Sequence, residues 1–416
     1  MTALKRYAIV SGVLFFLWGA ACVWIGSSLA KTAAFSENDI LFEIDTPRVV
    51  GDMTEFSAWH ARTKVHPLYV LLVNPLGVCL KILLKSNMTA SIVISSFFGF
   101  LGLVLAFALF FVANKDSVQA LLMTGLFAFS SSQWFLSVIP ETASFAVCSV
   151  ATTYLVFWIA LKEQRSCLSL WIVAGILSMA ITTTNFIQTL ICFTVHRIAI
   201  SKPCKMLTVV RVVAGYACGV FGLTAAFALL QKMIYPSSTL FFLPAAYKEE
   251  FQYGSFLAVR QPFTVVAQSL KHFFMTNVVA PAPHAYDLPH TLNPAITFNR
   301  SWDYRWIGGV ALFLWLGLLG NGIVHMVLSK KMRMFFVGMV LCLMFNIGFH
   351  CFYGVLADGR IELFLYTGNV TLLVMSFIGL HPVSTRLPIK IALAVLLVLV
   401  SANNGLVIQQ ILRIFG

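Results

Sequence analysis

Residues 66–85 read HPLYVLLVNPLGVCLKILLK, and the topology of the whole chain depends on whether this run crosses a membrane. Its length is that of a helix that spans the ~30 Å hydrocarbon core of a bilayer. Pro67 and Pro75 interrupt it, however, and Lys81 and Lys85 carry charge into its second half. If the run spans, every later loop lies on the opposite side, so the rest of the chain must decide its placement.

The rest of the chain is dominated by apolar runs. Of the 416 residues, 59% are hydrophobic and 10% are charged, whereas a soluble domain carries roughly 25% charged residues. The clear runs fall near residues 7–30, 89–113, 117–138, 141–161, 168–200, 207–231, 306–328, 333–354, 363–380 and 388–411. The first run lacks a clear small-residue cleavage site and is longer than a signal-peptide core, so we interpret it as retained. The pattern predicts an all-α polytopic membrane protein.

The distribution of charge favours one topology. The chain carries 28 Lys+Arg against 15 Asp+Glu, and basic residues mark the cytoplasmic loops of membrane proteins. Suppose that 66–85 does not span and that 168–200 is two short helices broken around residues 182–185. The short loops of one side then hold 14 basic residues and only two acids, Asp116 and Glu163. The opposite assumption scatters the basic loops over both sides.

We therefore predict about eleven spans, with interfacial or re-entrant helices in the first outward segment. The chain divides into an N-terminal transmembrane module (1–231) that includes this segment (30–88), a long outward loop (232–305) and C-terminal transmembrane helices (306–416). Aromatic residues, Pro and His stud the long loop, which indicates an ordered loop that packs on something. Because topology accounts for the basic excess, membrane lipids and not nucleic acid are the predicted partners.

The first outward segment holds the richest chemistry, where residues 43–52 read EIDTPRVVGD. Its carboxylates, Glu43, Asp45 and Asp52, are candidates for a general base, and Arg48 can hold a phosphate through a bidentate guanidinium. The alternative interpretation is a solvated loop with a local ion pair, since surface ion pairs are common and usually inert.

The order of the motifs resembles the GT-C superfamily of membrane glycosyltransferases. The acidic motif at 43–52 follows the first span, and a Pro-led aromatic helix begins at residues 66–69 (HPLY). Residues 140–142 (PET) stand at the next outward turn, paired short helices meet around 182–185, and residues 360–366 (RIELFLY) precede a late span. The resemblance implies a GT-C-like fold and an enzyme that takes a sugar from a polyprenyl-phosphate carrier at the outer face of the membrane.

The resemblance also implies an inverting displacement. A carboxylate deprotonates the acceptor hydroxyl, which attacks C1 of the lipid-linked sugar while the lipid phosphate leaves. Asp45 holds the place of the family's leading acid and is the preferred base. Many members carry adjacent acids there, whereas Thr46 follows Asp45 here, so Asp52 and Glu43 remain rivals. Glu141 stands where the family often has a second acid, which makes Asp45, Asp52 and Glu141 the catalytic candidates.

The leaving phosphate requires cations near the membrane surface. The predicted substrate-binding residues are Glu43, Arg48, His66, Tyr69, Arg260, Lys271, Arg300, Arg360 and Glu362. For any one loop cation, the alternative is a lipid headgroup contact or a snorkelling side chain. Arg360 stands apart, because Asp358 and Glu362 crowd the same short loop.

A metal site is not predicted. His272, His284 and His290 are spaced by 12 and 6 residues, which matches no common ligand pattern. Some members of the superfamily use a divalent cation and others do not, so we assign neither a metal nor a cofactor.

The function that the resemblance implies is a hexosyltransferase of the bacterial inner membrane with its site facing the periplasm. The chain is most similar to the serotype-converting enzymes that move glucose from undecaprenyl phosphate to an envelope glycan such as the O-antigen of lipopolysaccharide. One alternative is a lipid-linked sugar flippase or another transporter, although the spans nearly lack the mid-membrane ionisable residues of ion-coupled transporters. A second is an O-antigen polymerase or ligase, which would rely on outward arginines instead of a carboxylate base.

Overall fold

The computed structural model describes residues 3–165, 167–201, 206–248, 250, 262–289, 291–299, 301–354 and 363–416. Within these residues the named strands are β1 (His284–Tyr286) and β2 (Ala295–Thr297), which pair antiparallel. The other regular elements of this part are helices, so the predicted all-α polytopic class is confirmed.

Seven of the described helices are long and apolar enough to cross a membrane. They are α1 (Ala3–Leu29), α4 (Asn87–Asn114), α7 (Ala143–Glu163), α10 (Met206–Ile234), α13 (Arg305–Leu328), α14 (Arg333–His350) and α17 (Leu387–Phe415). A bent pair, α5 (Ser117–Phe129) and α6 (Ser131–Val138), passes the same test as one span with a 58° bend. These helices coincide with apolar runs of the sequence, because only hydrogen-bonded helical backbone is stable in lipid.

The predicted total of about eleven spans depends on three further helices. Helix α8 (Leu168–Ile181) has 14 residues and α16 (Gly368–Gly379) has 12, which gives each roughly 20 Å of length against a ~30 Å hydrocarbon core. Helix α9 (Thr183–Ile200) includes polar Thr, Asn and Gln residues. The crossing of the membrane by these three helices stays a prediction.

The run 168–200 is two helices, as predicted, and it breaks at Thr182. This residue has extended backbone (φ −154°, ψ 121°) and is both the C-cap of α8 and the N-cap of α9. The two helices pack on each other and on α7. The break therefore reverses the chain and brings residues 182–184 to the end of a helical hairpin.

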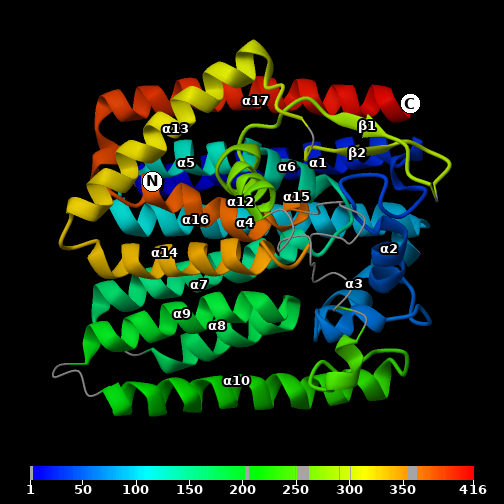
Figure 1. Ribbon diagram of the computed structural model, residues 1–416, viewed down its shortest axis with the longest axis horizontal. Coiled ribbons are helices and arrows are strands. Elements are labelled where there is room, and N and C mark those ends of the chain that lie inside the picture. Colours follow the sequence, from blue (N-terminus) through cyan, green and yellow to red (C-terminus); the bar gives the residue numbers. More distant parts are fainter. Residues whose placement is uncertain are drawn as a thin grey trace.

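The two ends of the bundle differ in what they carry (Figure 1). The connections from α13 to α14 and from α16 to α17 lie at the left end of the view, as does the start of α1. The β-hairpin, the end of α17, and helices α2 (Thr46–Thr54) and α3 (Tyr69–Leu84) lie at the right end. The connections predicted to be basic and the segments predicted to face outward are thus at opposite ends.

The first outward segment (residues 30–88) packs tightly on itself. A Cβ at Gly77 would lie 1.9 Å from the backbone oxygen of Met53, so only glycine permits the close approach of α3 to α2. Asn74 Nδ2 adds hydrogen bonds to the backbone oxygens of Asp52 (3.0 Å) and Glu55 (3.2 Å). Helix α3 has 16 residues, so at 1.5 Å per residue it is too short for a straight span. It is an apolar helix of the length expected for the predicted interfacial or re-entrant element.

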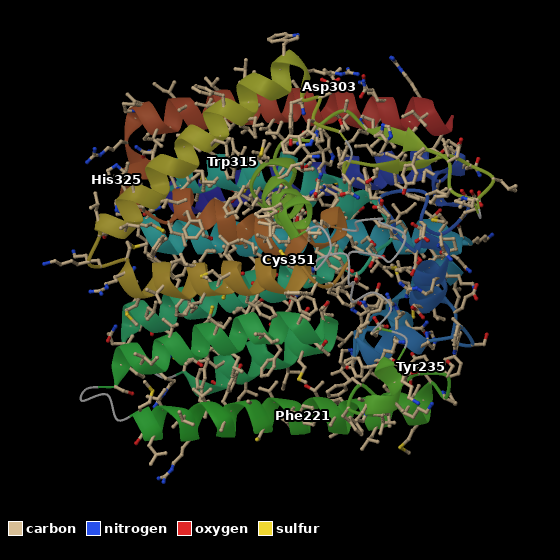
Figure 2. The ribbon with its side chains drawn as sticks, in the orientation of Figure 1. Phe221, Tyr235, Asp303, Trp315, His325 and Cys351 are labelled. Atoms are coloured by element: carbon tan, nitrogen blue, oxygen red, sulfur yellow. The ribbon has the colours of Figure 1, made fainter. Side chains whose placement is uncertain are left out.

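The described part of the long loop enters the bundle. It contains η3 (Pro244–Tyr247), α12 (Pro262–Lys271) and the π-helical turn η5 (His272–Thr276). Figure 1 shows α12 nearly end-on, across the direction of the long helices. Trp315 of α13, labelled in Figure 2, donates through its indole nitrogen to the backbone oxygen of Phe274 at 2.6 Å. The loop is therefore part of the helical packing.

Candidate functional site

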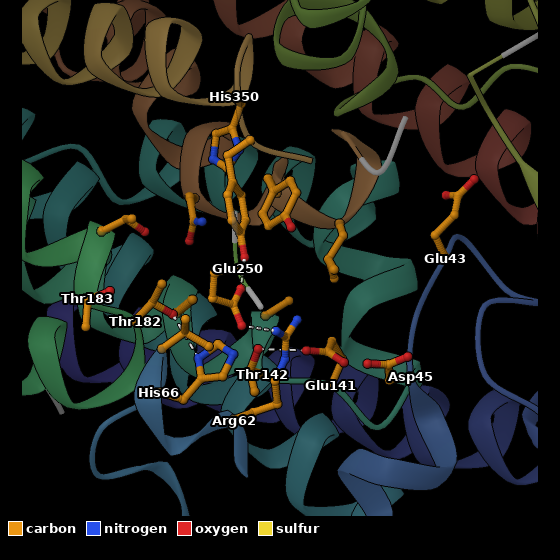
Figure 3. A pocket seen from close by; sticks show the side chains of 18 of the residues that line it. Glu43, Asp45, Arg62, His66, Glu141, Thr142, Thr182, Thr183, Glu250 and His350 are labelled. Carbon is orange, nitrogen blue, oxygen red and sulfur yellow. Dashed lines mark hydrogen bonds and ion pairs between the residues drawn. The ribbon is translucent and has the colours of Figure 1, made fainter. Parts of the chain in front are cut away.

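A cavity of about 690 Å³ lies among the first outward segment, the α6–α7 turn, the α8–α9 break and the end of α14 (Figure 3). Cavities of about 300–1,000 Å³ are typical of small-molecule sites. Of the predicted site residues, the cavity is lined by Glu43, Asp45, Arg48, His66 and Glu141. Residues that lie far apart in the sequence thus share one surface.

Arg48 organises the acidic wall. Its Nε donates to Asp45 Oδ2 at 3.0 Å and its Nη1 donates to Asp52 Oδ2 at 3.1 Å. Spacings of three and four residues place these side chains on one face of α2. Among the described residues, Asp45 Oδ1 has no hydrogen-bond partner, so Asp45 can receive a substrate while Arg48 fixes its orientation.

Asp52 lies behind Arg48 and outside the cavity lining. Its side chain is 5% exposed, against 33% for that of Asp45. His60 Nδ1 lies 2.8 Å from Asp52 Oδ1, so each carboxylate oxygen of Asp52 already contacts a side-chain nitrogen. This geometry gives Asp52 the role of positioning Arg48.

Glu141 is a buried carboxyl group that lines the cavity from the turn between α6 and α7. Thr142 Oγ1 donates to its Oε1 at 2.7 Å. Burial raises the pKa of Glu141, and the opposing effect of the Arg48 charge does not cancel it. Glu141 can therefore hold a proton more readily than an exposed carboxyl group.

The loop that carries Glu43 has strained backbone. Asp39, Phe42 and Glu43 have left-handed φ angles of 68°, 58° and 58°, and such angles are unfavourable for side chains larger than glycine. The Phe42 ring packs 4.6 Å from that of Phe298, and the Phe42 backbone nitrogen donates to Ile296 at 2.9 Å. These contacts hold the strained loop against the cavity.

His66 presents a neutral ring to the cavity. Its Nδ1 lies 2.6 Å from the backbone oxygen of Ile181, and because a carbonyl only accepts, Nδ1 carries the hydrogen. Burial lowers the pKa of His66 to about 4, so at neutral pH Nε2 is an acceptor. Tyr69 is buried beneath it, edge-on to Phe145 at 5.1 Å, and does not line the cavity.

A second charged cluster was not predicted. Arg62 Nη1 donates to Glu250 Oε1 at 2.6 Å, Lys64 Nζ lies 3.1 Å from the same oxygen, and the Tyr353 hydroxyl donates to Glu250 Oε2 at 2.8 Å. Burial opposes ionisation of Glu250, but Arg62, Tyr353 and Lys64 together lower its pKa. Because Glu250 lies 188 residues from Arg62 in the sequence, no local pattern joins them.

Aromatic side chains line another part of the cavity. The rings of His350 and Tyr366 stack with centroids 4.2 Å apart, and Phe349 stacks on Tyr353 at 5.2 Å. Phe352, which is 59% exposed, completes this part of the lining. Flat apolar surfaces with a few placed polar groups are typical of small-molecule sites.

Lys271 is not brought to the cavity. It is buried, and its Nζ donates to the backbone oxygens of Phe298 (2.9 Å), Asn299 (3.2 Å) and Ser301 (2.6 Å). Lys271 thus fixes the backbone that follows β2. The predicted residues Arg260, Arg300, Arg360 and Glu362 lie outside the described residues, as do His290 and Asp358.

Among the described residues, no group of three His, Cys, Asp or Glu side chains is arranged to hold a metal ion. His272 is buried with its Nδ1 2.8 Å from the backbone oxygen of Gln268, and His284 stacks on Tyr286. A comparison of the chain with family models and with curated proteins finds no match in either.

Proposed function

We propose that this chain is a GT-C-type glycosyltransferase that moves a sugar, expected to be glucose, from undecaprenyl phosphate to an envelope glycan such as O-antigen. The site would face the periplasm from the bacterial inner membrane. One observation carries the proposal. Asp45, Arg48 and Arg62 of the first outward segment and Glu141 of the α6–α7 turn converge on one cavity at one end of an apolar bundle.

The reaction assigns a role to each polar wall. Asp45 takes the proton of the acceptor hydroxyl, whose oxygen forms a bond to C1 of the sugar. The bond from C1 to the phosphate oxygen breaks, and its electron pair leaves with the phosphate. Arg48 orients Asp45 and offsets negative charge that develops nearby. Glu141 can accept a hydrogen bond from a sugar hydroxyl when it is ionised and can also donate one when it is protonated.

The aromatic part of the lining suits the remainder of the substrate. Phe349, Phe352, Tyr353 and Tyr366 add aromatic surface to the cavity lining. A sugar has both apolar ring faces and hydroxyl groups, so a cavity with lining groups of each kind can orient it. The isoprenoid chain of a lipid carrier can continue from this surface into the membrane.

A flippase or polymerase fits this arrangement less well. The buried polar groups of the helices beside the cavity include amide and hydroxyl pairs, such as Asn185 Nδ2 3.2 Å from Asn369 Oδ1 and Tyr154 OH 2.6 Å from Gln188 Oε1. Ion-coupled transporters place ionisable groups within their spans. A polymerase that relied on arginines would not require Asp45.

The test is an assay of purified protein with a panel of polyprenyl-phosphate sugars. Release of lipid phosphate only when a glycan acceptor is present is the expected result, and Asp45→Asn should abolish it. Release without an acceptor would indicate a hydrolase, and transport of the intact sugar lipid across a vesicle without release would replace the proposal with a flippase.

A further inference from the structure

Within the part of the chain that the structure describes, the side chains of Arg62, Lys64 and Tyr353 gather around the carboxylate of Glu250. All three donors contact Glu250, at 2.6 Å from Arg62, 3.1 Å from Lys64 and 2.8 Å from Tyr353. Arg62, Tyr353 and Glu250 line the same cavity as Asp45 and Glu141. Figure 3 shows Arg62 and Glu250 joined by a dashed line, with Glu141 beside Arg62.

The donors are held by contacts other than those to Glu250. The Thr63 hydroxyl bonds to the backbone of Thr239 on both sides, accepting from its nitrogen at 2.6 Å and donating to its oxygen at 2.9 Å. The Tyr247 hydroxyl donates to the backbone oxygen of Lys64 at 2.8 Å. The ring of Tyr353 packs on that of Phe349. These contacts fix the backbone that carries the two cations and the ring of Tyr353 without the help of Glu250.

The donor set matches a phosphate better than a carboxylate. Both cations share Oε1 of Glu250, and Tyr353 uses Oε2. A phosphate monoester offers three terminal oxygens, one for each donor, and guanidinium groups bind phosphate in a forked geometry. A carboxylate in this position resembles a smaller anion in a site built for a larger one.

We propose that Arg62, Lys64 and Tyr353 form a phosphate-binding subsite, and that the carboxylate of Glu250 competes with phosphate for it. The identification of this phosphate with that of a lipid carrier rests on the proposed function. Glu250 remains ionised at neutral pH, because the charges around it lower its pKa despite its burial. The competitor is thus itself an anion, and a phosphate must displace it to bind.

The experiment measures binding of farnesyl phosphate and of inorganic phosphate to the detergent-purified full chain by calorimetry. Glu250→Gln removes the charge that competes with phosphate for the three donors, so it should lower the Kd of farnesyl phosphate by about tenfold. Arg62→Gln should raise it by about the same factor. The matched control is Glu37→Gln, because Glu37 bonds to Leu292 and Asn293 outside the cavity lining and should leave the Kd unchanged.

Glu250→Asp covers the case in which the Gln variant does not fold. Its carboxylate is one methylene shorter and reaches the donors less well, so binding should again tighten, by a smaller factor. Unchanged or weaker binding in a folded Glu250 variant would overturn the proposal. Loss of folding in both variants would show that Glu250 is a structural partner of the cations and would overturn it as well.

The two probes identify the source of the phosphate. Tightening for farnesyl phosphate alone assigns the subsite to a lipid headgroup, and tightening for both probes assigns it to phosphate groups in general; each result supports the subsite. No sugar is transferred in this assay. If Glu250 competes with phosphate here and the purified protein transfers no sugar in the transfer assay, the subsite is retained and the glycosyltransferase is refuted. If sugar is transferred but Glu250 does not compete, the glycosyltransferase is retained and the subsite is refuted.

Discussion

The cavity and the buried segment 276–280 are two polar regions within one apolar bundle, and they differ in where their polar atoms find partners. In the segment, Ala280 N donates to Asn404 Oδ1 at 2.9 Å, and Asn404 Nδ2 contacts the oxygens of Phe129 (2.8 Å) and Val278 (2.9 Å). In the cavity, Asp45 keeps one oxygen without a partner among the described residues.

The difference separates structural from functional polarity. Near the middle of α17, Asn404 closes hydrogen bonds that irregular backbone needs at membrane depth. The break between α5 and α6 contributes in the same way, because Ser131 N and Ser132 N donate to Val278 and Asn277 at 3.1 Å each. A polar group that is hydrogen-bonded to the backbone stabilises the fold, whereas a polar group that lines a cavity and keeps an unused acceptor is available to a substrate.

The largest expected effect is on the cavity side of this comparison. Asp45→Asn removes the proposed base and should lower the rate of sugar transfer by about 10²–10⁴-fold. Because Asp45 is partly exposed, the melting temperature should change little. Lipid phosphate release and thermal unfolding in detergent measure the two quantities.

Asp52→Asn is the control for Asp45→Asn. Asp52 is buried and holds both Arg48 and His60, so its substitution should lower the melting temperature and reduce transfer only through Arg48. Transfer that survives in Asp45→Asn but is lost in Asp52→Asn would move the base to Asp52.

On the structural side, Asn404→Leu should destabilise the protein by about 2–5 kcal/mol. Its loss leaves Ala280 N and Phe129 O without the Asn404 partner in an apolar environment, at about 1–3 kcal/mol for each unsatisfied group. Val278 O keeps its hydrogen bond from Ser131 N. Thermal unfolding in detergent measures the effect. A melting temperature equal to that of the wild type would show that these backbone groups do not depend on Asn404.

Glu141 is both buried and part of the cavity lining, and the pH dependence of stability tests the effect of that burial. Its folded-state pKa is raised above the usual 4.5 by burial, so the folded protein holds this proton more tightly than the unfolded chain does. The stability of the wild type relative to Glu141→Gln should therefore be greatest below that usual value and fall as the pH rises through the raised one. Melting temperatures of both proteins at about pH 4 and about pH 7.5 test this; a difference that does not vary with pH would contradict it.

The smallest effect is expected at Asn277, which contrasts with Asn404. Both side-chain atoms of Asn277 are buried without a hydrogen-bond partner in the part of the chain that the structure describes. Asn277→Leu removes unpaired polar atoms and keeps the volume, so stability should change by less than about 1 kcal/mol or rise. A loss as large as that of Asn404→Leu would reveal a polar partner at Asn277.

The sequence was sufficient for the features that depend on local pattern. Apolar runs predicted the long helices, because lipid forces such runs into helices, and the polar residues 182–185 predicted the break at Thr182. Charge bias and motif order predicted five site residues that the structure brings to one cavity: Glu43, Asp45, Arg48, His66 and Glu141.

The features that the sequence did not predict depend on distant contacts. Glu250 meets Arg62 and Tyr353 only through tertiary packing, across 188 and 103 residues. Asp45 and Asp52 are equivalent in helical position, and only the packing of His60 and α3 covers Asp52. A surface cation and a buried one also look alike in sequence. The sequence predicts that Lys271 binds substrate, whereas in the structure its Nζ donates to backbone carbonyl oxygens.

The start of α1 and the end of α17 lie at opposite ends of the bundle (Figure 1). A chain arranged in this way traverses the bundle an odd number of times, and this parity does not depend on the hydropathy of any one helix. Because α14 ends at the cavity and α17 begins at the other end, α16 leads back toward the end at which α17 begins. The hairpin of α8 and α9 changes the total by two or not at all. Cysteines introduced just before α1 and just after α17 should therefore react with impermeant reagents from opposite sides of the membrane.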